Sequence, residues 1–274
     1  LHTLVLEANN DVANATTKAN SAILHAGYDP EPGTRMAALN VEGNRMALDI
    51  CRRLDVPVRQ TGSLVLAFAP EQLPHLQTLY ERGLANGVPG LELLSGDAAR
   101  ALEPELSLQV CGALHAPTAA VVDPWGFALA MIETAVQNGV ELRRSAPVTA
   151  IRPLPGGGFA LATPQGTVQA RFVVNAAGVD ADRVHALLEP VSWRTQPSRG
   201  EYYLLDKTEG GRVGRVIFQC PGPEGKGVLV APTVHGNLIV GPNAQAVDGP
   251  DEVGNTAAGL AFVKKMALKS VPGI

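Results

Sequence analysis

The sequence predicts an α/β protein that combines two kinds of sheet. Over the first half of the chain, helices with apolar residues at helical spacing alternate with short buried strands. From residue 140 onward, short strands separated by turn residues dominate. Elements in this order are typical of an α/β nucleotide-binding domain that carries an inserted α+β domain.

The first half begins with a strand and a long helix. Residues 4–7 are a short apolar run that ends in an acid, as a buried parallel strand does. A Pro-Gly turn then precedes a helix expected at 35–54. The apolar residues at helical spacing in this helix are Met36, Leu39, Met46, Ile50 and Leu54. A strand at 62–68 and a helix at 70–86 follow.

Two further helices carry end signals. Ser95 or Asp97 is the expected N-cap of a short helix. The next helix is expected at 123–138, with Asp123 as its cap, Pro124 in the first position and Gly139 beyond its end.

The second half is expected to be rich in strands. Turn sequences such as PGGG and PQG separate the first group of apolar runs. The expected strands are 140–143, 148–153, 159–163, 166–174, 202–205, 213–219, 228–232 and 238–242. A helix at about 255–269 closes the chain.

Composition narrows the class of protein. The 274 residues are 46% hydrophobic, enough to bury a large core in one domain or two interleaved domains. A net charge of -4 and the lack of a basic cluster argue against nucleic-acid binding. No apolar run reaches the roughly 18 to 20 residues of a membrane span. The three cysteines suit neither a zinc site nor a disulfide framework, so no metal is expected and a reduced cytoplasmic protein is the default.

The two ends of the chain lead us to expect further residues before the first strand and after the last helix. The chain opens directly on a strand, without a turn or cap, and stops after a helix-like segment. We expect an upstream strand, Gly-rich turn and helix, because the acid at the end of a dinucleotide-binding strand normally lies about 20 residues after such a turn. Glu7 occupies that position and would hold ribose hydroxyls. Considered alone, Glu7 is explained more simply as a solvated acid.

A second candidate ligand site lies at residues 172–187. A buried strand is expected to run into Asn175, Ala177 and Gly178, with a helix opening near Asp180 or Asp182. Small residues allow close backbone approach, and a helix N-terminus favours phosphate. An ordinary strand-turn-helix explains the pattern equally well.

Two strand-associated segments carry polar side chains. Strand alternation places Arg199, Glu201 and Tyr203 on one face and Tyr202 and Leu204 on the other. The first face suits either a ligand site or a solvent-facing edge. A hairpin turn at 233–237 contains Thr233, His235 and Asn237. Lone histidines, including His2, His75 and His185, are more often structural.

These segments together resemble the FAD-dependent oxidoreductases of the D-amino-acid oxidase superfamily. The branch with anaerobic-type glycerol-3-phosphate dehydrogenases and L-2-hydroxyglutarate oxidases is the most similar. The matching segments are LVLEANNDVANATTKANSAILHAGYDP, AAVVDPWGFALAMIETAVQNGVEL, VVNAAGVDADRV, PSRGEYYLLDK and GVLVAPTVHGNLIVGP. The resemblance implies an incomplete Rossmann-like FAD-binding domain (1–60 and 123–190) and an inserted α+β substrate domain on an antiparallel sheet (61–122 and 191–274).

The resemblance also implies roles for individual residues. Glu7 would bind the adenosine ribose of FAD, and the backbone at Val148 would face the adenine. The segment TTKANSAILHAGYDP would form the flavin-side loop, with His25 near the isoalloxazine. Its pyrophosphate and ring contacts would come from Thr16, Thr17, Asn20 and Ser21, and Ala177 and Gly178 would close the adenosine side. Arg199, Glu201, Tyr203 and the 233–237 turn with His235 would cover the substrate.

The implied reaction is removal of hydride from a small anionic hydroxylated substrate, either glycerol 3-phosphate or a 2-hydroxy acid such as L-2-hydroxyglutarate. His25 would take the hydroxyl proton, or would only hydrogen-bond within the flavin wall. The alternatives are an amine or amino-acid oxidase of the same superfamily and a non-catalytic subunit. The electron acceptor stays open, as does peripheral contact with the inner face of the membrane or with a partner subunit.

Overall fold

The structure is a computed structural model that describes residues 2–222, 225 and 227–274. The chain divides into two compact units. Unit 1 contains Leu1–Asn20, Pro124–Arg199 and Gln245–Val253, and unit 2 contains Ser21–Asp123, Gly200–Ala244 and Gly254–Ile274. Each unit is therefore assembled from three separate stretches of sequence.

Of the boundaries expected at residues 60, 122 and 190, the one at 122 lies within one residue of a division point, whereas those at 60 and 190 coincide with none. Helix α1 (Arg35–Arg53) belongs to unit 2 and not to the part that was expected to bind FAD. One reason is its inward polar face, where Asn44 donates to the carbonyl groups of Leu24 and Thr118 in unit 2. Residues 191–199 and 245–253 belong to unit 1, where Ser198–Arg199 pair with Gln245–Ala246 as a short ribbon.

Unit 1 contains a parallel strand pair and an antiparallel sheet. Strand β1 (Leu4–Leu6) pairs in parallel with β8 (Glu141–Arg143), as expected for the strand at 4–7. The three-stranded antiparallel sheet has the order β11-β10-β9. Its strands are β9 (Ala150–Pro153), β10 (Phe159–Thr163) and β11 (Gly166–Ala170). The ribbon consists of β12 (Ser198–Arg199) and β17 (Gln245–Ala246).

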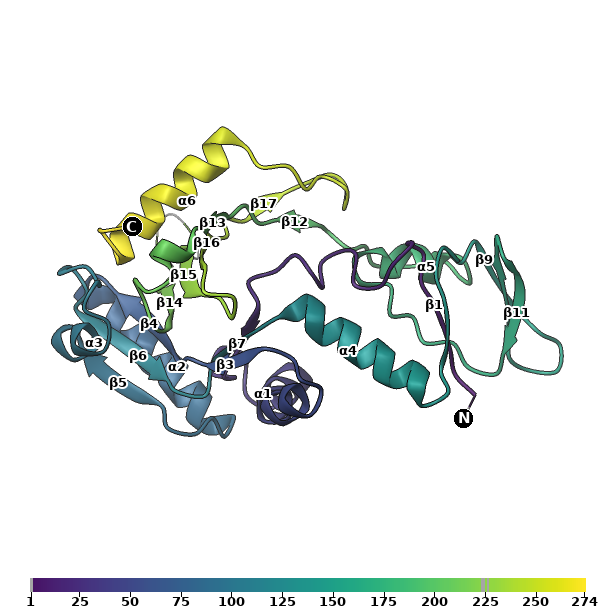
Figure 1. Cartoon of the computed structure of the whole chain (residues 1–274), viewed down its shortest axis with the longest axis horizontal. Helices are drawn as coiled ribbons and strands as arrows, with labels where there is room; N and C mark the ends of the chain where they lie inside the picture. Colours follow the sequence, from purple (N-terminus) through teal and green to yellow (C-terminus); the bar gives the residue numbers. More distant parts are fainter. Residues whose placement is uncertain (1, 223–224, 226) are drawn as a thin grey trace. The chain divides into compact units, whose positions relative to one another are not determined.

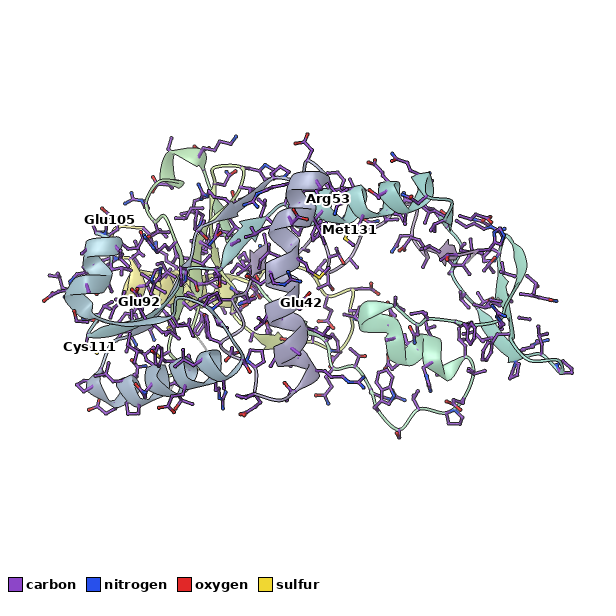
Figure 2. All side chains as sticks on the ribbon, turned by 90° about the horizontal axis from the view of Figure 1, so that it is seen from below. Glu42, Arg53, Glu92, Glu105, Cys111 and Met131 are labelled. Carbon is purple, nitrogen blue, oxygen red and sulfur yellow. The ribbon has the colours of Figure 1, made fainter. Side chains whose placement is uncertain are left out.

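Unit 1 contains the helices α4 (Pro124–Gln137) and α5 (Ala181–Ala186), and neither has a buried residue. Helix α4 begins at Pro124, as predicted, and Gly139 beyond its end has a positive φ of 89°. None of its side chains is buried, and Met131 is 51% exposed (Figure 2). The 3-10 turn η2 (Gly178–Asp180) leads into the short helix α5, which confirms a helix opening near Asp180.

The buried strand expected up to residue 174 is wrong beyond Ala170. Residues 172–174 form no strand, and Phe172 and Val174 are 77% and 87% exposed. The physical reason is the lack of a pairing strand: no described strand lies beside this apolar run, so its backbone groups and side chains stay solvated.

Unit 2 is organised around a seven-stranded sheet of order β13-β16-β15-β14-β4-β6-β5 (Figure 1). All its neighbours are antiparallel except β14 and β4, which are parallel. The strands are β4 (Ser63–Ala67), β5 (Glu92–Ser95), β6 (Gly112–Ala116), β13 (Tyr203–Leu205), β14 (Val216–Gln219), β15 (Leu229–Pro232) and β16 (Leu238–Gly241). The expected antiparallel block is thus confirmed, with one parallel exception.

Helices and a second small sheet flank this sheet. The small sheet has the order β2-β7-β3, formed by β2 (Ile23–Leu24), β7 (Ala120–Val122) and β3 (Val58–Gln60). The other elements are η1 (Pro70–Gln72), α2 (Leu73–Ala85), α3 (Gly96–Leu102), η3 (Lys207–Glu209) and α6 (Ala257–Ser270). Side chains of Thr34, Ser95 and Thr256 cap α1, α3 and α6, so Ser95 and not Asp97 is the cap of α3.

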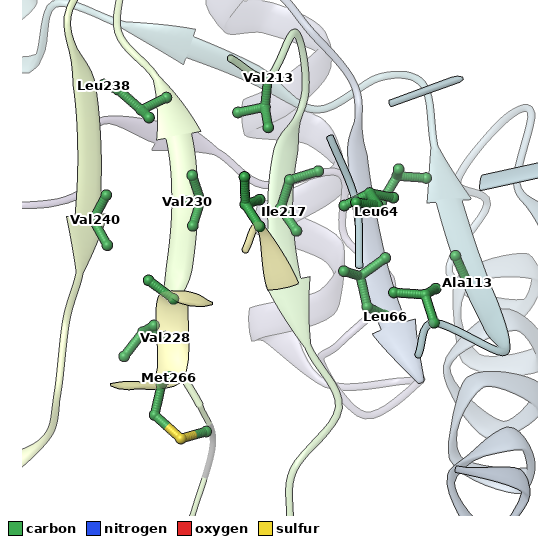
Figure 3. Close-up of a cluster of buried hydrophobic side chains, with 14 of the residues drawn as sticks. Leu64, Leu66, Ala113, Val213, Ile217, Val228, Val230, Leu238, Val240 and Met266 are labelled. Atoms are coloured by element: carbon green, nitrogen blue, oxygen red, sulfur yellow. The ribbon is translucent and has the colours of Figure 1, made fainter. Parts of the chain in front are cut away.

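The two faces of the seven-stranded sheet have different neighbours. Figure 3 shows Leu64, Leu66, Ile217 and Val230 packed beside one another on the face that α6 covers with Met266. The opposite face carries Val216 and Leu229, against which the small sheet packs through Val121. This second face also holds the candidate active site.

Candidate active site

His25 lies directly after β2 and stacks on a side chain of the seven-stranded sheet. Its imidazole and the Phe218 ring have centroids 5.6 Å apart and planes inclined by 26°. The backbone on either side is held by α1, because Asn40 donates to the His25 carbonyl at 3.0 Å and Asn44 donates to the Leu24 carbonyl at 3.3 Å. Sequence patterns gave no signal for these two amides, which are one helical turn apart.

The surroundings of His25 favour its neutral form. Packing of protein atoms around the imidazole lowers its pKa below the usual 6.5, and the carboxylate of Asp29 opposes this shift. The residue nevertheless keeps substantial solvent exposure. A neutral imidazole near pH 7 can accept a proton.

Ser21, four residues before His25, is bonded to the large sheet. Its hydroxyl lies 2.7 Å from the Tyr202 hydroxyl, and either can donate. Burial raises the pKa of Tyr202, and the bond to Ser21 lowers it in part. Tyr202 directly precedes β13, so this bond joins the start of the His25 segment to the strand at the edge of the sheet.

Strand register places Tyr202 in the same row of the sheet as Phe218. Leu229 pairs with Gly241. Tyr203 pairs with Val240, so in this antiparallel register Tyr202 lies opposite Gly241. Ile217 pairs with Val230, so Phe218 lies opposite Leu229. The side chains of such a row project from the same face. The row therefore brings Tyr202 and Phe218 to the face on which His25 lies.

This register overturns the predicted substrate face of residues 199–203. Tyr203 packs into the core under α6, and Glu201 is fully buried at the start of that helix, where it accepts bonds from the N–H and hydroxyl of Thr256. Tyr202 and Leu204 occupy the His25 face instead. The sequence alone does not show which of the two faces is buried. The face with Glu201 and Tyr203 is buried by α6, which begins more than 50 residues later in the chain.

Arg199 belongs to unit 1, whereas Glu201 belongs to unit 2. Arg199 forms part of the β12–β17 ribbon, and its Nη2 donates to Oε1 of Gln245 at 2.7 Å. Its expected role as a substrate anchor stays a prediction.

His235 lies in the turn between β15 and β16, as expected. The turn is closed by the Thr233 N–H, which donates to the Asn237 carbonyl at 2.9 Å. His235 is exposed, and its Nε2 lies 3.8 Å from Oδ2 of Asp123. This distance allows an ion pair when the imidazole is protonated but exceeds a hydrogen bond.

Unit 1 holds most of the residues expected to bind FAD. Glu7 follows β1 at its carboxyl end and is half-buried, and its Oε1 accepts the Asn9 N–H at 2.7 Å. Val148 lies in the loop before β9 and not within a strand as expected. Neither backbone group of Val148 makes a hydrogen bond within the described part of the chain.

The segment 14–20 of unit 1 forms a compact turn. The Asn20 amide donates to the carbonyls of Thr16 and Thr17 at 3.0 and 2.8 Å, and Lys18 pairs with Asn14. Both threonine side chains are exposed, and among the described residues neither hydroxyl has a hydrogen-bond partner. The hydroxyls therefore remain available to an external group.

Ala177 and Gly178 lie at the turn before α5. The N–H of Ala177 bonds the Asn175 side chain, and Gly178 has a positive φ of 58° with open space where a Cβ would project. Four features fit the ribose, phosphate and adenine of FAD. They are the carboxylate of Glu7, the exposed hydroxyls of Thr16 and Thr17, the backbone groups of Val148 and the open turn at Gly178.

A cavity of about 480 Å³ lies between α6 and residues 107–109, but none of the candidate residues lines it. Within ranges 2–222 and 227–274, no group of three or more His, Cys, Asp or Glu could hold a metal ion. Nor does any helix there combine the length and apolar character needed to cross a membrane.

Known proteins resemble this chain along nearly its whole length. A glycerol 3-phosphate dehydrogenase of Caloramator mitchellensis is 45% identical over 271 residues, covering 99% of this chain and 56% of the relative. The mitochondrial L-2-hydroxyglutarate dehydrogenase of Mus musculus is 30% identical, covering 88% of this chain and 54% of the relative. The chain thus spans little more than half the length of these two relatives.

A solved structure has the same fold. Dithionite-reduced L-alpha-glycerophosphate oxidase from Mycoplasma pneumoniae with FAD bound superposes with a TM-score of 0.90 at 25% identity, covering 99% of this chain and 72% of that chain. The family model described as FAD dependent oxidoreductase matches residues 1–274. This chain therefore belongs to the FAD dependent oxidoreductase family, DAO.

Proposed function

We propose that the protein containing this chain is an FAD-dependent dehydrogenase or oxidase that acts on a small anionic substrate with a CH–OH group. The substrate is glycerol 3-phosphate or a 2-hydroxy acid such as L-2-hydroxyglutarate. The observation that carries the proposal is the 45% identity with a glycerol 3-phosphate dehydrogenase across 99% of the chain.

The residues of this chain would bind the reactants and move one proton. When bound, FAD supplies the acceptor for the hydride that leaves the substrate carbon. Nε2 or Nδ1 of His25 accepts the hydroxyl proton, so the O–H and C–H bonds break and a C=O bond forms. The lowered pKa of His25 supports this role, because it keeps the imidazole neutral before the reaction.

Glu7 would accept the ribose hydroxyls of FAD, Thr16, Thr17, Asn20 and Ser21 would lie along the pyrophosphate and ring, and Ala177 and Gly178 would approach the adenosine. Arg199 would anchor the substrate anion through its planar guanidinium, and His235 would lie over the substrate. Electrons would then pass to dioxygen, a quinone or a partner protein.

A cytoplasmic location is part of the proposal. The three cysteines are free thiols, which suits a reducing compartment. A quinone acceptor would in addition require peripheral contact with the inner face of the membrane, and a protein acceptor would require a partner subunit.

The test is anaerobic reduction of the bound flavin, followed by its visible absorption. We expect glycerol 3-phosphate or L-2-hydroxyglutarate to bleach the spectrum, and glycine and L-proline to leave it unchanged. Bleaching by an amino acid alone would replace this proposal with an amine oxidase. A purified protein without flavin absorption that fails to take up added FAD would instead be a non-catalytic subunit.

A further inference from the structure

The ring of Tyr202 packs closely against two glycines, Gly200 and Gly241. A Cβ on Gly241, whose φ is +136°, would lie 2.8 Å from Cδ1 of the Tyr202 ring. A Cβ on Gly200 would lie 3.3 Å from Cε2 of the same ring and 2.6 Å from Cβ of Pro242. Because a real side chain at either position would push into the ring or its support, the sequence around Tyr202 is built to confine this ring.

The confined ring places its hydroxyl on Ser21. The two oxygens are 2.7 Å apart although the residues are 181 positions apart in the sequence. From Ser21 the chain continues into β2, where Ile23 pairs with Val121 and Leu24 with Ala120. The segment then ends at His25, whose carbonyl accepts a bond from Asn40.

Several contacts hold segment 21–25. Besides the stacking of His25 on Phe218, the N–H of Val122 donates to the Ala22 carbonyl at 2.9 Å. Strand β7 holds its middle, α1 holds its end, and Tyr202 holds its start. The bond to Tyr202 ties the first residue of the segment to the residue that precedes β13, at the edge of the sheet that also carries Phe218. Removing it would loosen Ser21 while Ala22 stays bonded to Val122, so we expect a small displacement of the segment relative to the ring on which His25 stacks.

We propose that Tyr202 is a positioning residue: its hydroxyl, bonded to Ser21, fixes the start of segment 21–25 and thereby the place of the His25 imidazole over Phe218. The position of the imidazole is a property of this chain alone. Its consequence for catalysis rests on the proposed function.

The first measurement reports the position of His25 directly. Stacking on Phe218 shifts the Cε1 proton resonance of the imidazole through the ring current, and His25→Asn identifies that resonance among the six histidines. Histidine-labelled protein would be compared as wild type, Tyr202→Phe, Ser21→Ala and the double variant. Tyr203→Phe is the matched control, because Tyr203 packs into the opposite face of the sheet.

We expect Tyr202→Phe and Ser21→Ala to move the His25 resonance in the same direction and by a similar amount. The double variant should move it no further, since both changes remove one bond. Tyr203→Phe should leave it in place. An unchanged His25 resonance in Tyr202→Phe, or shifts that add in the double variant, would overturn the proposal.

The second measurement is anaerobic flavin reduction in the holoenzyme. We expect Tyr202→Phe and Ser21→Ala each to lower the limiting reduction rate by on the order of 10- to 100-fold, with little change in KM, because a misplaced base costs mainly the chemical step. Normal rates alongside a shifted resonance would overturn the catalytic part. Failure of every hydroxylated substrate to reduce the wild type would refute the proposed function while the resonance data still decide the positioning role.

Discussion

At the residue scale, His25 combines a neutral imidazole with solvent access. Because its pKa is lowered below 6.5, the base form predominates at neutral pH and is lost as the pH falls through that lowered value. If His25 is the proton acceptor, the rate of flavin reduction should rise with pH through one ionisation below 6.5 and then stay level. Anaerobic stopped-flow reduction between pH 5 and 8 measures this profile.

Replacing His25 by Asn keeps a similar size and one hydrogen-bonding group but removes the base. We expect the limiting reduction rate to fall by roughly 100- to 10,000-fold and the low-pH ionisation to disappear. His75→Asn on α2 is the matched control and should behave as wild type. A His25→Asn enzyme within a few-fold of wild type, with the same pH profile, would remove His25 from the chemistry and make His235 the next residue to test.

Glu7 offers a residue-scale test of cofactor binding. Glu7→Ala removes the half-buried carboxylate at the end of β1 and should weaken FAD binding by about 1–3 kcal/mol, with little effect on turnover at saturating FAD. Glu141→Ala on the neighbouring strand β8 removes an acid that pairs with Arg143 and should leave FAD affinity unchanged. Equal FAD affinities in wild type and Glu7→Ala would make Glu7 a solvated strand end.

Some residue positions could be predicted from the sequence, and others could not. The strand before Glu7 was predictable because a short apolar run that ends in an acid is a local pattern, and β1 confirms it. The role of Glu7 in binding FAD stays a prediction. The placement of Glu201 and Tyr203 on a ligand face was wrong, because alternation separates two faces but does not say which one a distant helix will bury. Tyr202 was overlooked for the same reason, since its partner Ser21 is 181 residues away.

At the element scale, a buried carboxylate organises the start of α6. Glu201 accepts the N–H of Thr256 at 2.9 Å and the Thr256 hydroxyl at 3.0 Å, while the same hydroxyl accepts the N–H of Gly259. Negative charge at a helix N-terminus is stabilising, and the two donors would be costly to leave unpaired. The glycine faces this carboxylate so closely that a Cβ there would overlap it.

In Gly259→Ala, helix propensity and packing should change the free energy of unfolding in opposite directions. Alanine is the better helix former by about 1 kcal/mol, yet here we expect a loss of about 1–3 kcal/mol in the free energy of unfolding, because the methyl group displaces the Glu201 carboxylate. Gly43→Ala in α1 is the matched control, since open space surrounds Gly43, and it should gain about 0.5–1 kcal/mol. Urea denaturation of both variants measures the difference, and a stabilised Gly259→Ala would refute the tight contact.

Elements were predictable where the chain itself carries their boundaries. The Pro-Gly turn and the apolar spacing located α1 to within one residue of its end, and Pro124 marked the start of α4. The strand expected up to residue 174 failed because an apolar run becomes a strand only beside a partner strand. Its residues Phe172 and Val174 have none among the described strands.

At the scale of the whole molecule, the hydrophobic core is very unevenly distributed. Among the described residues, the buried hydrophobic side chains of unit 1 are Ala146, Ile151 and Leu161, whereas all three core clusters belong to unit 2. Regions with few buried apolar contacts open at lower free energy than a packed core. Amide hydrogens of β1 and β8–β11 should therefore exchange faster than those of β4, β14 and β15 in the absence of flavin.

FAD should reduce this imbalance, because Glu7, Thr16, Thr17, Val148 and Gly178 all lie in unit 1. A ligand that binds the folded form stabilises it by mass action, by about 2.7 kcal/mol at 100 times its Kd. Hydrogen exchange followed by mass spectrometry, with and without FAD at that concentration, should then show strong slowing in the peptides of β1 and residues 144–149, and a smaller effect in β4 and β14. Glu7→Ala provides the matched control, since at the same FAD concentration it should lose part of the slowing in unit 1. Slowing confined to unit 2, or equal in wild type and Glu7→Ala, would mean that Glu7 and its neighbours do not hold the cofactor.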